Sequence, residues 1–163
     1  MNQAVATTGP QQLEAMQRQG LEDFVTFFIK DQMFGILVLK VQEILTPDKI
    51  APIPLAPPEV EGSINLRGRI VNVIDMRERL GLGHRDTADK PMDVTVEQSH
   101  ELYTLLVDRI GDVVSLSTDL YEDNPSTLDT LWREFALGVY RLDGPLMVVL
   151  NVDRILEISY TSS

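Results

Sequence analysis

Side chains with the chemistry for catalysis are few in this chain, and they are scattered. The two histidines, His84 and His100, lie in polar stretches beside other charged residues, and neither belongs to a metal-binding spacing such as HExxH. Ser63, Ser115 and Ser117 lack the GxSxG context of a nucleophilic serine. We therefore interpret both histidines as surface residues, and we find no candidate catalytic constellation.

Carboxylates offer two further candidates. Glu59 and Glu61 have the types of an acid–base pair, but they lie in a stretch rich in proline and glycine, which favours surface charge. The acidic set between 119 and 129 lacks the ligand spacing and glycine of a calcium loop. The GLGHRD segment at 81–86 lacks the full glycine pattern and terminal Lys-Ser/Thr of a phosphate loop. We expect no cofactor and no metal.

Composition narrows the classes of partner and compartment. The chain of 163 residues carries 25 acidic against 14 basic side chains, a net charge of −11, which disfavours nucleic acids and anionic membranes. The absence of cysteine excludes disulfides, thiolate zinc sites and a cysteine nucleophile, and it fits a reducing compartment. No segment has the roughly 18 to 20 apolar residues of a membrane span, and the N-terminus has no signal-peptide pattern. We expect a cytoplasmic protein without membrane insertion.

Short apolar runs between turn signals predict an all-β fold. Residues 24–29 and 33–38 are β-branched and aromatic and predict a hairpin. The segment 39–45 fits either one helical turn or a strand. Further strands are expected at 64–66, 69–75, 94–96, 102–107, 113–116, 137–142 and 145–149. About nine or ten short strands with few helices favour a sandwich or a pair of barrels.

The connecting segments carry their own predictions. Five prolines between 46 and 58 predict a loop or irregular edge, with a proline-rich ligand as the alternative. We also expect a short turn at 76–80, a surface loop at 81–90, a turn at 108–112, an acidic polar stretch at 117–134 and a final short helix capped by Asn151 or Asp153. Residues 1–20 are expected to form a flexible extension, or a short helix between Pro10 and Gly20.

Four segments in one order resemble the CheW family of chemotaxis coupling proteins, over about residues 22–158. They read FVTFFIKDQMFGILVLKVQEI, INLRGRIVNVIDMRERLGL, LLVDRIGDVVSL and GVYRLDGPLMVVLNVDRIL. The most specific part is KVQEI, followed about 20 residues later by NLRGRIV and then IDMR, where the family usually has VDLR. The chain departs from the family at Met76, at Tyr103-Thr104 and over 125–136.

The resemblance implies a fold and a function. The fold would be two small five-stranded SH3-like β-barrels around a shared hydrophobic core, with short helices, over residues 21–160. The function would be that of a non-enzymatic adaptor that links membrane chemoreceptors to the histidine kinase CheA, whose regulatory domain has the same fold. Such an adaptor joins signalling arrays beneath the membrane, and we expect it to be a monomer when free.

The resemblance also implies a receptor-binding surface. Val41 and Glu43 match the receptor-facing segment of the family, and Arg67 matches the arginine of NLRG. Glu43 and Arg67 are expected to form an ion pair at the edge of the receptor groove, which Met92 and Val113 would line. Taken alone, an arginine before Gly68 is either an exposed hairpin residue or a group offered to a partner. The kinase-facing surface would lie on the opposite barrel, at residues we cannot name.

Two other functions remain open from the sequence. One is a related scaffold, serving type IV pili or development, or a receiver-fused variant that has lost its second domain. A stand-alone coupling protein is favoured over that variant because the chain ends near residue 160. The other is an acidic β-barrel enzyme acting on a small substrate, for which the sequence supplies no nucleophile, base or metal ligands.

Overall fold

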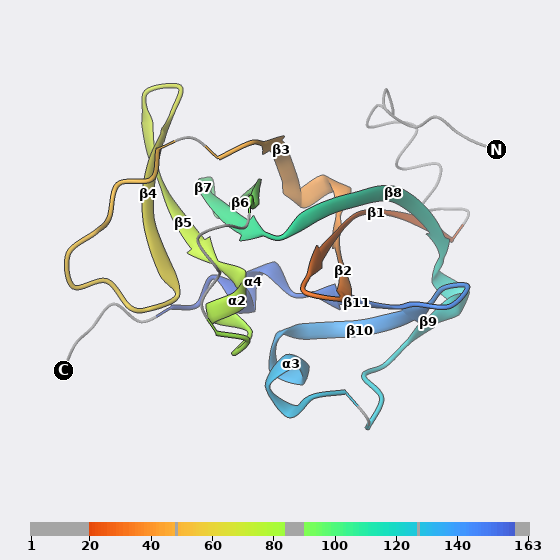
Figure 1. Cartoon of the computed structure of the whole chain (residues 1–163). Coiled ribbons are helices and arrows are strands. Elements are labelled where there is room, and N and C mark those ends of the chain that lie inside the picture. The colour runs from red at the N-terminus through yellow and green to blue at the C-terminus, as the bar shows by residue number, and fades with distance from the viewer. Residues whose placement is uncertain (1–19, 48, 84–89, 127, 159–163) are drawn as a thin grey trace.

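The computed structural model describes residues 20–47, 49–83, 90–126 and 128–158. Within them the chain forms eleven strands in two sheets, with three short α-helices (Figure 1). The expectation of an all-β fold is confirmed. The predictions for residues 1–19, and for most of the 81–90 loop, lie outside the described residues.

The first sheet, sheet A, has six strands in the order β8-β1-β2-β11-β10-β9. Their bounds are Arg109–Ser117 (β8), Leu21–Ile29 (β1), Gln32–Leu37 (β2), Leu146–Leu150 (β11), Ala136–Arg141 (β10) and Tyr121–Glu122 (β9). Neighbours are antiparallel except β2 and β11, which are parallel. The predicted hairpins, β1–β2 and β10–β11, are both present.

The second sheet, sheet B, has five strands in the order β3-β6-β7-β5-β4. Their bounds are Val41–Leu45 (β3), Met92–Gln98 (β6), Glu101–Val107 (β7), Arg69–Asp75 (β5) and Val60–Leu66 (β4). Only the β5–β7 pair is parallel. The 39–45 segment contains both predicted alternatives, because the 3₁₀ turn η1 (Val38–Lys40) leads directly into β3.

In each sheet a segment of the chain links the two edge strands. In the described residues the two edge strands of neither sheet pair with each other, so both are curled, open sheets. In sheet A the edge strands β8 and β9 are joined by a single 3₁₀ turn, η2 (Thr118–Leu120). In sheet B the proline-rich segment after β3 forms an isolated bridge to the opposite edge, through Ala51 and Ser63 of β4.

Three apolar clusters hold the sheets together. Sheet A encloses a cluster of Phe24, Tyr140, Met147 and Val149, and sheet B one of Ile64, Leu66, Val71, Val73 and Leu106. A larger cluster takes residues from both sheets, among them Phe27, Phe34, Val94, Leu105 and Val148. Alternate strand residues therefore face either the sheet's own core or the shared core. This arrangement agrees with two SH3-like subdomains around a common centre, but in the described part of the chain sheet A has six strands rather than the expected five and neither sheet closes into a barrel.

Two segments differ from the sequence-based prediction. The turn expected at 108–112 is wrong, because only Asp108 separates β7 from β8 and extended chain resumes at Arg109. Position 111 of β8 excludes a side chain, because a Cβ atom there would lie 2.5 Å from Thr26 Oγ1 of the neighbouring strand. The polar 117–134 stretch contains η2, β9 and the start of α3, all too short for periodicity to reveal.

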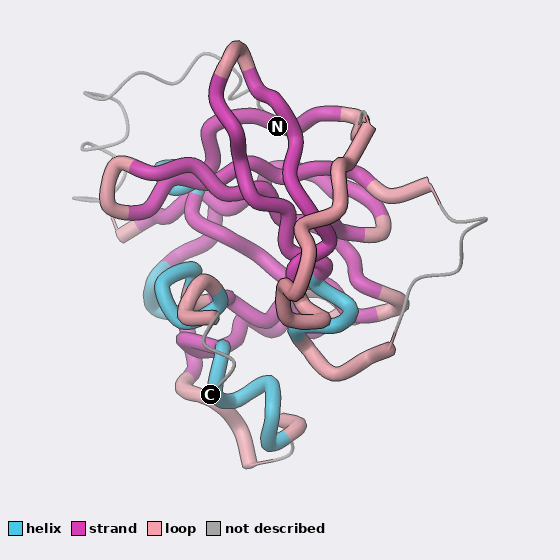
Figure 2. The backbone as a smooth tube through the Cα atoms, turned by 90° about the vertical axis from the view of Figure 1, so that its left-hand side faces the viewer, coloured by secondary structure: helices cyan, strands magenta, loops and turns pink. Residues whose placement is uncertain are grey.

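The α-helices are α2 (Met76–Arg79), α3 (Thr130–Phe135) and α4 (Val152–Ile155). Side-chain oxygens of Asp75, Asp129 and Asn151 cap their N-termini, so Asn151, rather than Asp153, begins the predicted final helix. In Figure 1 all three lie well below the tip of the β4–β5 hairpin, and Figure 2 shows the same separation of helices and tip.

Candidate functional site

The β4–β5 hairpin presents Arg67 at its tip. Leu66 pairs with Arg69, so Arg67 and Gly68 alone form the loop. Both have left-handed backbone, with φ of 53° and 84°, as a type I′ turn requires. The Asn65 side-chain oxygen accepts a 2.9 Å hydrogen bond from the Gly68 N–H and holds the loop closed.

The backbone at Arg67 is not the most stable choice for this turn. Asparagine and glycine tolerate left-handed backbone, whereas a longer side chain loses about 1 kcal/mol there. Strained residues of this kind cluster at functional sites. Arg67 thus places a long cationic side chain at a turn position where asparagine or glycine would be more favourable.

Arg67 forms an ion pair with Glu43. Its Nη2 donates a 2.7 Å hydrogen bond to Glu43 Oε1. The arginine side chain is 75% exposed and the glutamate 17% exposed, so the guanidinium is held in place while still facing solvent. Glu43 lies on β3 and Arg67 follows β4, and these are the two edges of sheet B. The pair therefore bridges the edges of the sheet.

The other predicted receptor-facing residues are not part of the Glu43–Arg67 pair. Val41 lies two residues before Glu43 on β3, beside a register irregularity, and packs against the shared core. Met92 opens β6 at the far end of the β3–β6 ladder and is also partly buried against that core. Val113 lies on β8 of sheet A and is 50% exposed. The structure thus joins Glu43 to Arg67 directly and leaves Met92 and Val113 apart from them.

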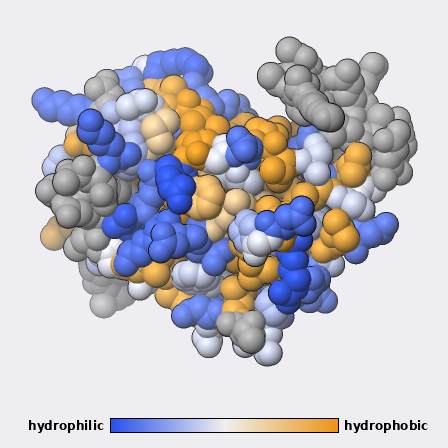
Figure 3. Space-filling model, turned by 45° about the vertical axis from the view of Figure 1, so that its right-hand side comes forward, coloured by the Kyte–Doolittle hydropathy of each residue, from blue (hydrophilic) through white to orange (hydrophobic). Residues whose placement is uncertain are grey.

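Exposed apolar residues that the sequence did not single out flank β3. Leu39 in η1 is 58% exposed and Ile44 on β3 is 38% exposed. Figure 3 shows one face of the molecule, on which apolar side chains gather in several patches between polar ones. Leucine and isoleucine are among the residue types most often buried, so nothing in the sequence distinguished these two from core residues.

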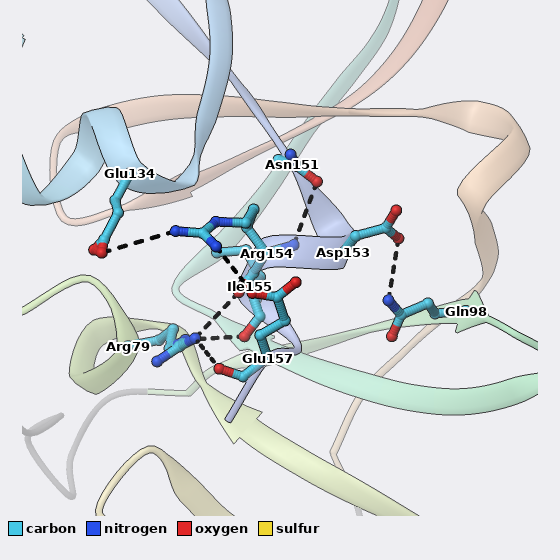
Figure 4. Close-up of polar contacts among 8 residues, drawn as sticks. All are labelled: Arg79, Gln98, Glu134, Asn151, Asp153, Arg154, Ile155 and Glu157. Atoms are coloured by element: carbon cyan, nitrogen blue, oxygen red, sulfur yellow. Dashed lines mark hydrogen bonds and ion pairs between the residues drawn. The ribbon is translucent and has the colours of Figure 1, made fainter. Parts of the chain in front are cut away.

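A separate hollow of about 430 Å³ lies among the helices. Its lining is Glu59, Glu78, Arg79, Gly81, Leu131, Glu134, Phe135, Arg154 and Glu157. Arg79 donates to the backbone carbonyls of Arg154, Ile155 and Glu157 (Figure 4), and its guanidinium lies 4.6 Å from the Phe135 ring centroid.

Both arginines of this hollow are paired with groups of its own lining. Burial lowers the pKa of Arg79, and the nearby Glu59 carboxylate opposes that shift. Arg154 pairs with Glu157 at 3.0 Å and lies 4.0 Å from Glu134. These groups anchor α4 and the chain after it to α2, so we assign the hollow a structural role.

Acid–base and metal chemistry gain no new support from the geometry. Within the described ranges, no three His, Cys, Asp or Glu side chains come together as a metal site requires. His100 is exposed and, with Ser99, has the left-handed backbone of the two-residue β6–β7 turn. No helix among the described residues is long and apolar enough to cross a membrane.

Comparison with known proteins supplies the family. The model of the CheW-like domain matches residues 23–159. The chain belongs to the CheW family. Met76, Tyr103-Thr104 and the 125–136 stretch, where the sequence departs from the usual CheW pattern, all lie inside the matched range.

CheW relatives are similar over most of their own length. The probable chemotaxis protein CheW of Rhizobium etli is 26% identical over 139 residues, which cover 85% of this chain and 90% of the relative. The chemotaxis protein CheW of Thermotoga maritima is 29% identical over 135 residues, covering 83% and 87%. The solved structure of the scaffolding protein TtCheW from Thermoanaerobacter tengcongensis superposes with a TM-score of 0.76 at 27% identity, covering 87% of this chain and 97% of that one.

Proposed function

We propose that this protein is a non-enzymatic adaptor that couples chemoreceptors to the histidine kinase CheA in signalling arrays at the inner face of the membrane. The observation that carries the proposal is Arg67, an exposed guanidinium held by Glu43 on a strained turn. The match of the CheW-like domain over residues 23–159 supports the proposal. In this proposal the 21–160 region is the coupling domain.

Receptor binding would use the surface around β3. A receptor tip is helical, and an amphipathic helix binds a groove through apolar anchors with a polar rim. Val41, Leu39 and Ile44 are apolar residues on or next to β3, and Met92 and Val113 would extend the apolar surface. The Glu43–Arg67 pair would form the rim.

The rim pair would orient the partner more than it would add affinity. An exposed ion pair contributes at most about 1 kcal/mol. Its value lies in the fixed direction of the guanidinium, which offers its remaining N–H groups to a carboxylate or carbonyl of the partner. The kinase would bind elsewhere, through its regulatory domain, and the free adaptor would be a monomer.

Calorimetric titration with two separate ligands tests the proposal. The ligands are a receptor cytoplasmic fragment and the regulatory domain of CheA. We expect both to bind. We expect Arg67→Glu to weaken receptor binding about tenfold or more, because it opposes Glu43 and removes the donor, while kinase binding and the circular dichroism spectrum stay unchanged.

Arg141→Glu is the matched control. It makes the same charge change in another exposed ion pair, with Glu122 on sheet A, and should leave receptor binding intact. Binding of neither ligand by the folded wild-type protein would overturn the proposal. Receptor binding that survives Arg67→Glu would remove Arg67 from the site.

A further inference from the structure

Asp108 occupies the point where the chain passes from one sheet to the other. β7 of sheet B ends at Val107 and β8 of sheet A begins at Arg109, so one residue connects the two sheets here. The Asp108 N–H donates a 3.0 Å hydrogen bond to the Phe28 carbonyl of β1. The crossing is thereby fixed to sheet A by its backbone.

The Asp108 carboxylate is contacted from both sides of this crossing. On the side of sheet A, the Lys30 N–H in the β1–β2 turn donates to Oδ2 at 2.5 Å. On the side of sheet B, Arg77 of α2, the helix that directly follows β5, donates from Nε to Oδ1 at 2.9 Å and from Nη2 to Oδ2 at 2.8 Å. One carboxylate therefore joins an element of each sheet.

Arg77 is itself held rigidly. Its backbone N–H donates to the Asp75 side chain, the N-cap of α2, at 3.0 Å. The Arg77 and Asp108 side chains are only 14% and 13% exposed. A bidentate guanidinium–carboxylate contact between nearly buried groups has one allowed orientation, unlike a flexible surface pair.

Stability alone does not account for this pair. A buried ion pair loses hydration, and well-packed apolar residues of similar size often give equal or greater stability. In some proteins a buried ion pair of this kind is retained because it selects one geometry. Two of the segments on which the family resemblance rests, IDMR and LLVD, supply the two residues, which are 31 positions apart.

We propose that Lys30, Arg77 and Asp108 form an inter-sheet junction that fixes the orientation of sheet A relative to sheet B. Arg77 and Asp108 are then positioning residues for any partner assembly that contacts both sheets. This consequence for partner assembly rests on the proposed adaptor function, whereas the orientation itself does not.

Residual dipolar couplings of backbone N–H groups test the orientation directly. In the wild-type protein, couplings from sheet A and sheet B should fit one alignment tensor. Arg77→Lys keeps the charge but loses the bidentate contact. In this variant the couplings of each sheet, fitted separately, should agree with the structure as well as in wild type. The two alignment tensors should differ in direction by more than 10° or in magnitude. Asp108→Asn is the second variant and should give the same result.

Arg141→Lys is the control, because it makes the same substitution in an arginine–carboxylate contact within sheet A alone, where Arg141 Nε donates to both oxygens of Glu122. It should leave one common tensor. A common tensor in folded Arg77→Lys, even with lowered stability, would overturn the junction and reduce the pair to a stabilising contact. Should Asp108→Asn fail to fold, Arg77→Lys still decides the matter.

Titrations separate this inference from the proposed function. Arg77→Lys should bind the kinase domain alone within about twofold of wild type. It should bind the receptor fragment, and form the complex of all three, at least fivefold more weakly, because the proposed receptor surface takes Arg67 from sheet B and Val113 from sheet A. Unchanged assembly with two tensors would overturn the role in assembly. Failure of wild type to bind either ligand would overturn the adaptor function while the tensor result stands.

Discussion

Tyr140 combines deep burial with an unmade hydrogen bond. It is 1% exposed in the core of sheet A, with its ring against those of Phe24 and Tyr121. Among the described residues its hydroxyl has no hydrogen-bond partner. A buried hydroxyl without a partner loses its hydrogen bonds to water and forms none in the protein, which is unfavourable. The ring packing rather than the oxygen therefore stabilises the protein at this position.

Tyr140→Phe should therefore be neutral or slightly stabilising at pH 7, within about 1 kcal/mol of wild type in urea unfolding. Burial raises the pKa of Tyr140 to about 12, with Glu22 adding to the shift. The unfolded chain loses this proton near pH 10. Ionisation of Tyr140 therefore leaves the free energy of unfolding unchanged below pH 10. It lowers that free energy by about 1.4 kcal/mol per pH unit as the pH rises from 10 toward 12.

Urea unfolding at pH 8 and pH 11 measures this term. The wild-type protein should lose more stability between the two than Tyr140→Phe does. Equal losses in the two proteins would contradict the assignment of the high-pH transition to Tyr140.

At the same scale, the sequence predicted residue types better than residue contacts. Arg67 before Gly68 indicated a turn, and the resemblance implied its partner Glu43, which the structure places 2.7 Å away. Nothing in the sequence indicated that Arg67 itself has left-handed backbone, or that Asp108 joins two sheets. The first feature depends on the register of the β4–β5 hairpin, and the second on the pairing of β8 with β1, which is far away in the chain. Spacing encodes neither.

Among the elements, the proline-rich segment shows how sheet B is closed at its edge. Ala51 exchanges two 2.8 Å backbone hydrogen bonds with Ser63 of β4. This approach requires glycine at 62, because a Cβ atom there would overlap the Ala51 carbonyl and lie 2.8 Å from the Ile50 side chain. The segment was predicted as a loop or irregular edge, and it is an irregular edge.

Gly62→Ala should lower the free energy of unfolding by about 2 kcal/mol or more, since the backbone carbonyl cannot move aside as a side chain could. Gly68→Ala is the matched control. Its φ is also positive, at 84°, but nothing lies within 4 Å of the added Cβ. We expect it to lose only about 1 kcal/mol. Equal losses in chemical denaturation would show that backbone strain, rather than the close approach, makes glycine necessary at 62.

Elements with a strong pattern were predictable and short ones were not. The β1–β2 hairpin and the β10–β11 hairpin follow from alternation and turn residues. By contrast, η2, β9 and α3 are held by local side-chain caps, such as Ser117 and Asp129, and by tertiary contacts. Asp and Ser are as common in loops as in caps, so the acidic 117–134 stretch gave no decisive signal.

For the whole molecule, the shared core makes the two sheets mutually dependent. Each sheet curls around its own small cluster, yet the largest cluster takes residues from both. A sheet separated from the other would expose that common apolar surface to water, which is unfavourable by about 25 cal/mol per Å². We therefore expect one cooperative unfolding transition rather than two.

Trp132, the one tryptophan of the chain, reports on the shared core. Its ring contacts Phe34 edge-on, and its Nε1 donates to the Leu80 carbonyl. Val73 belongs to the separate cluster of sheet B and is fully buried. Val73→Ala should lower the free energy of unfolding, monitored by Trp132 fluorescence, by about 2 kcal/mol for the lost methyl groups and the remaining cavity.

The fluorescence curve should shift to lower urea with unchanged slope and should coincide with the circular dichroism curve. Ile70→Ala, in the same strand but 79% exposed, should leave both curves in place. If the sheets unfolded independently, Val73→Ala would split the circular dichroism curve and leave the Trp132 transition where it was. In that case the shared core could not transmit the orientation that the junction at Asp108 is proposed to set.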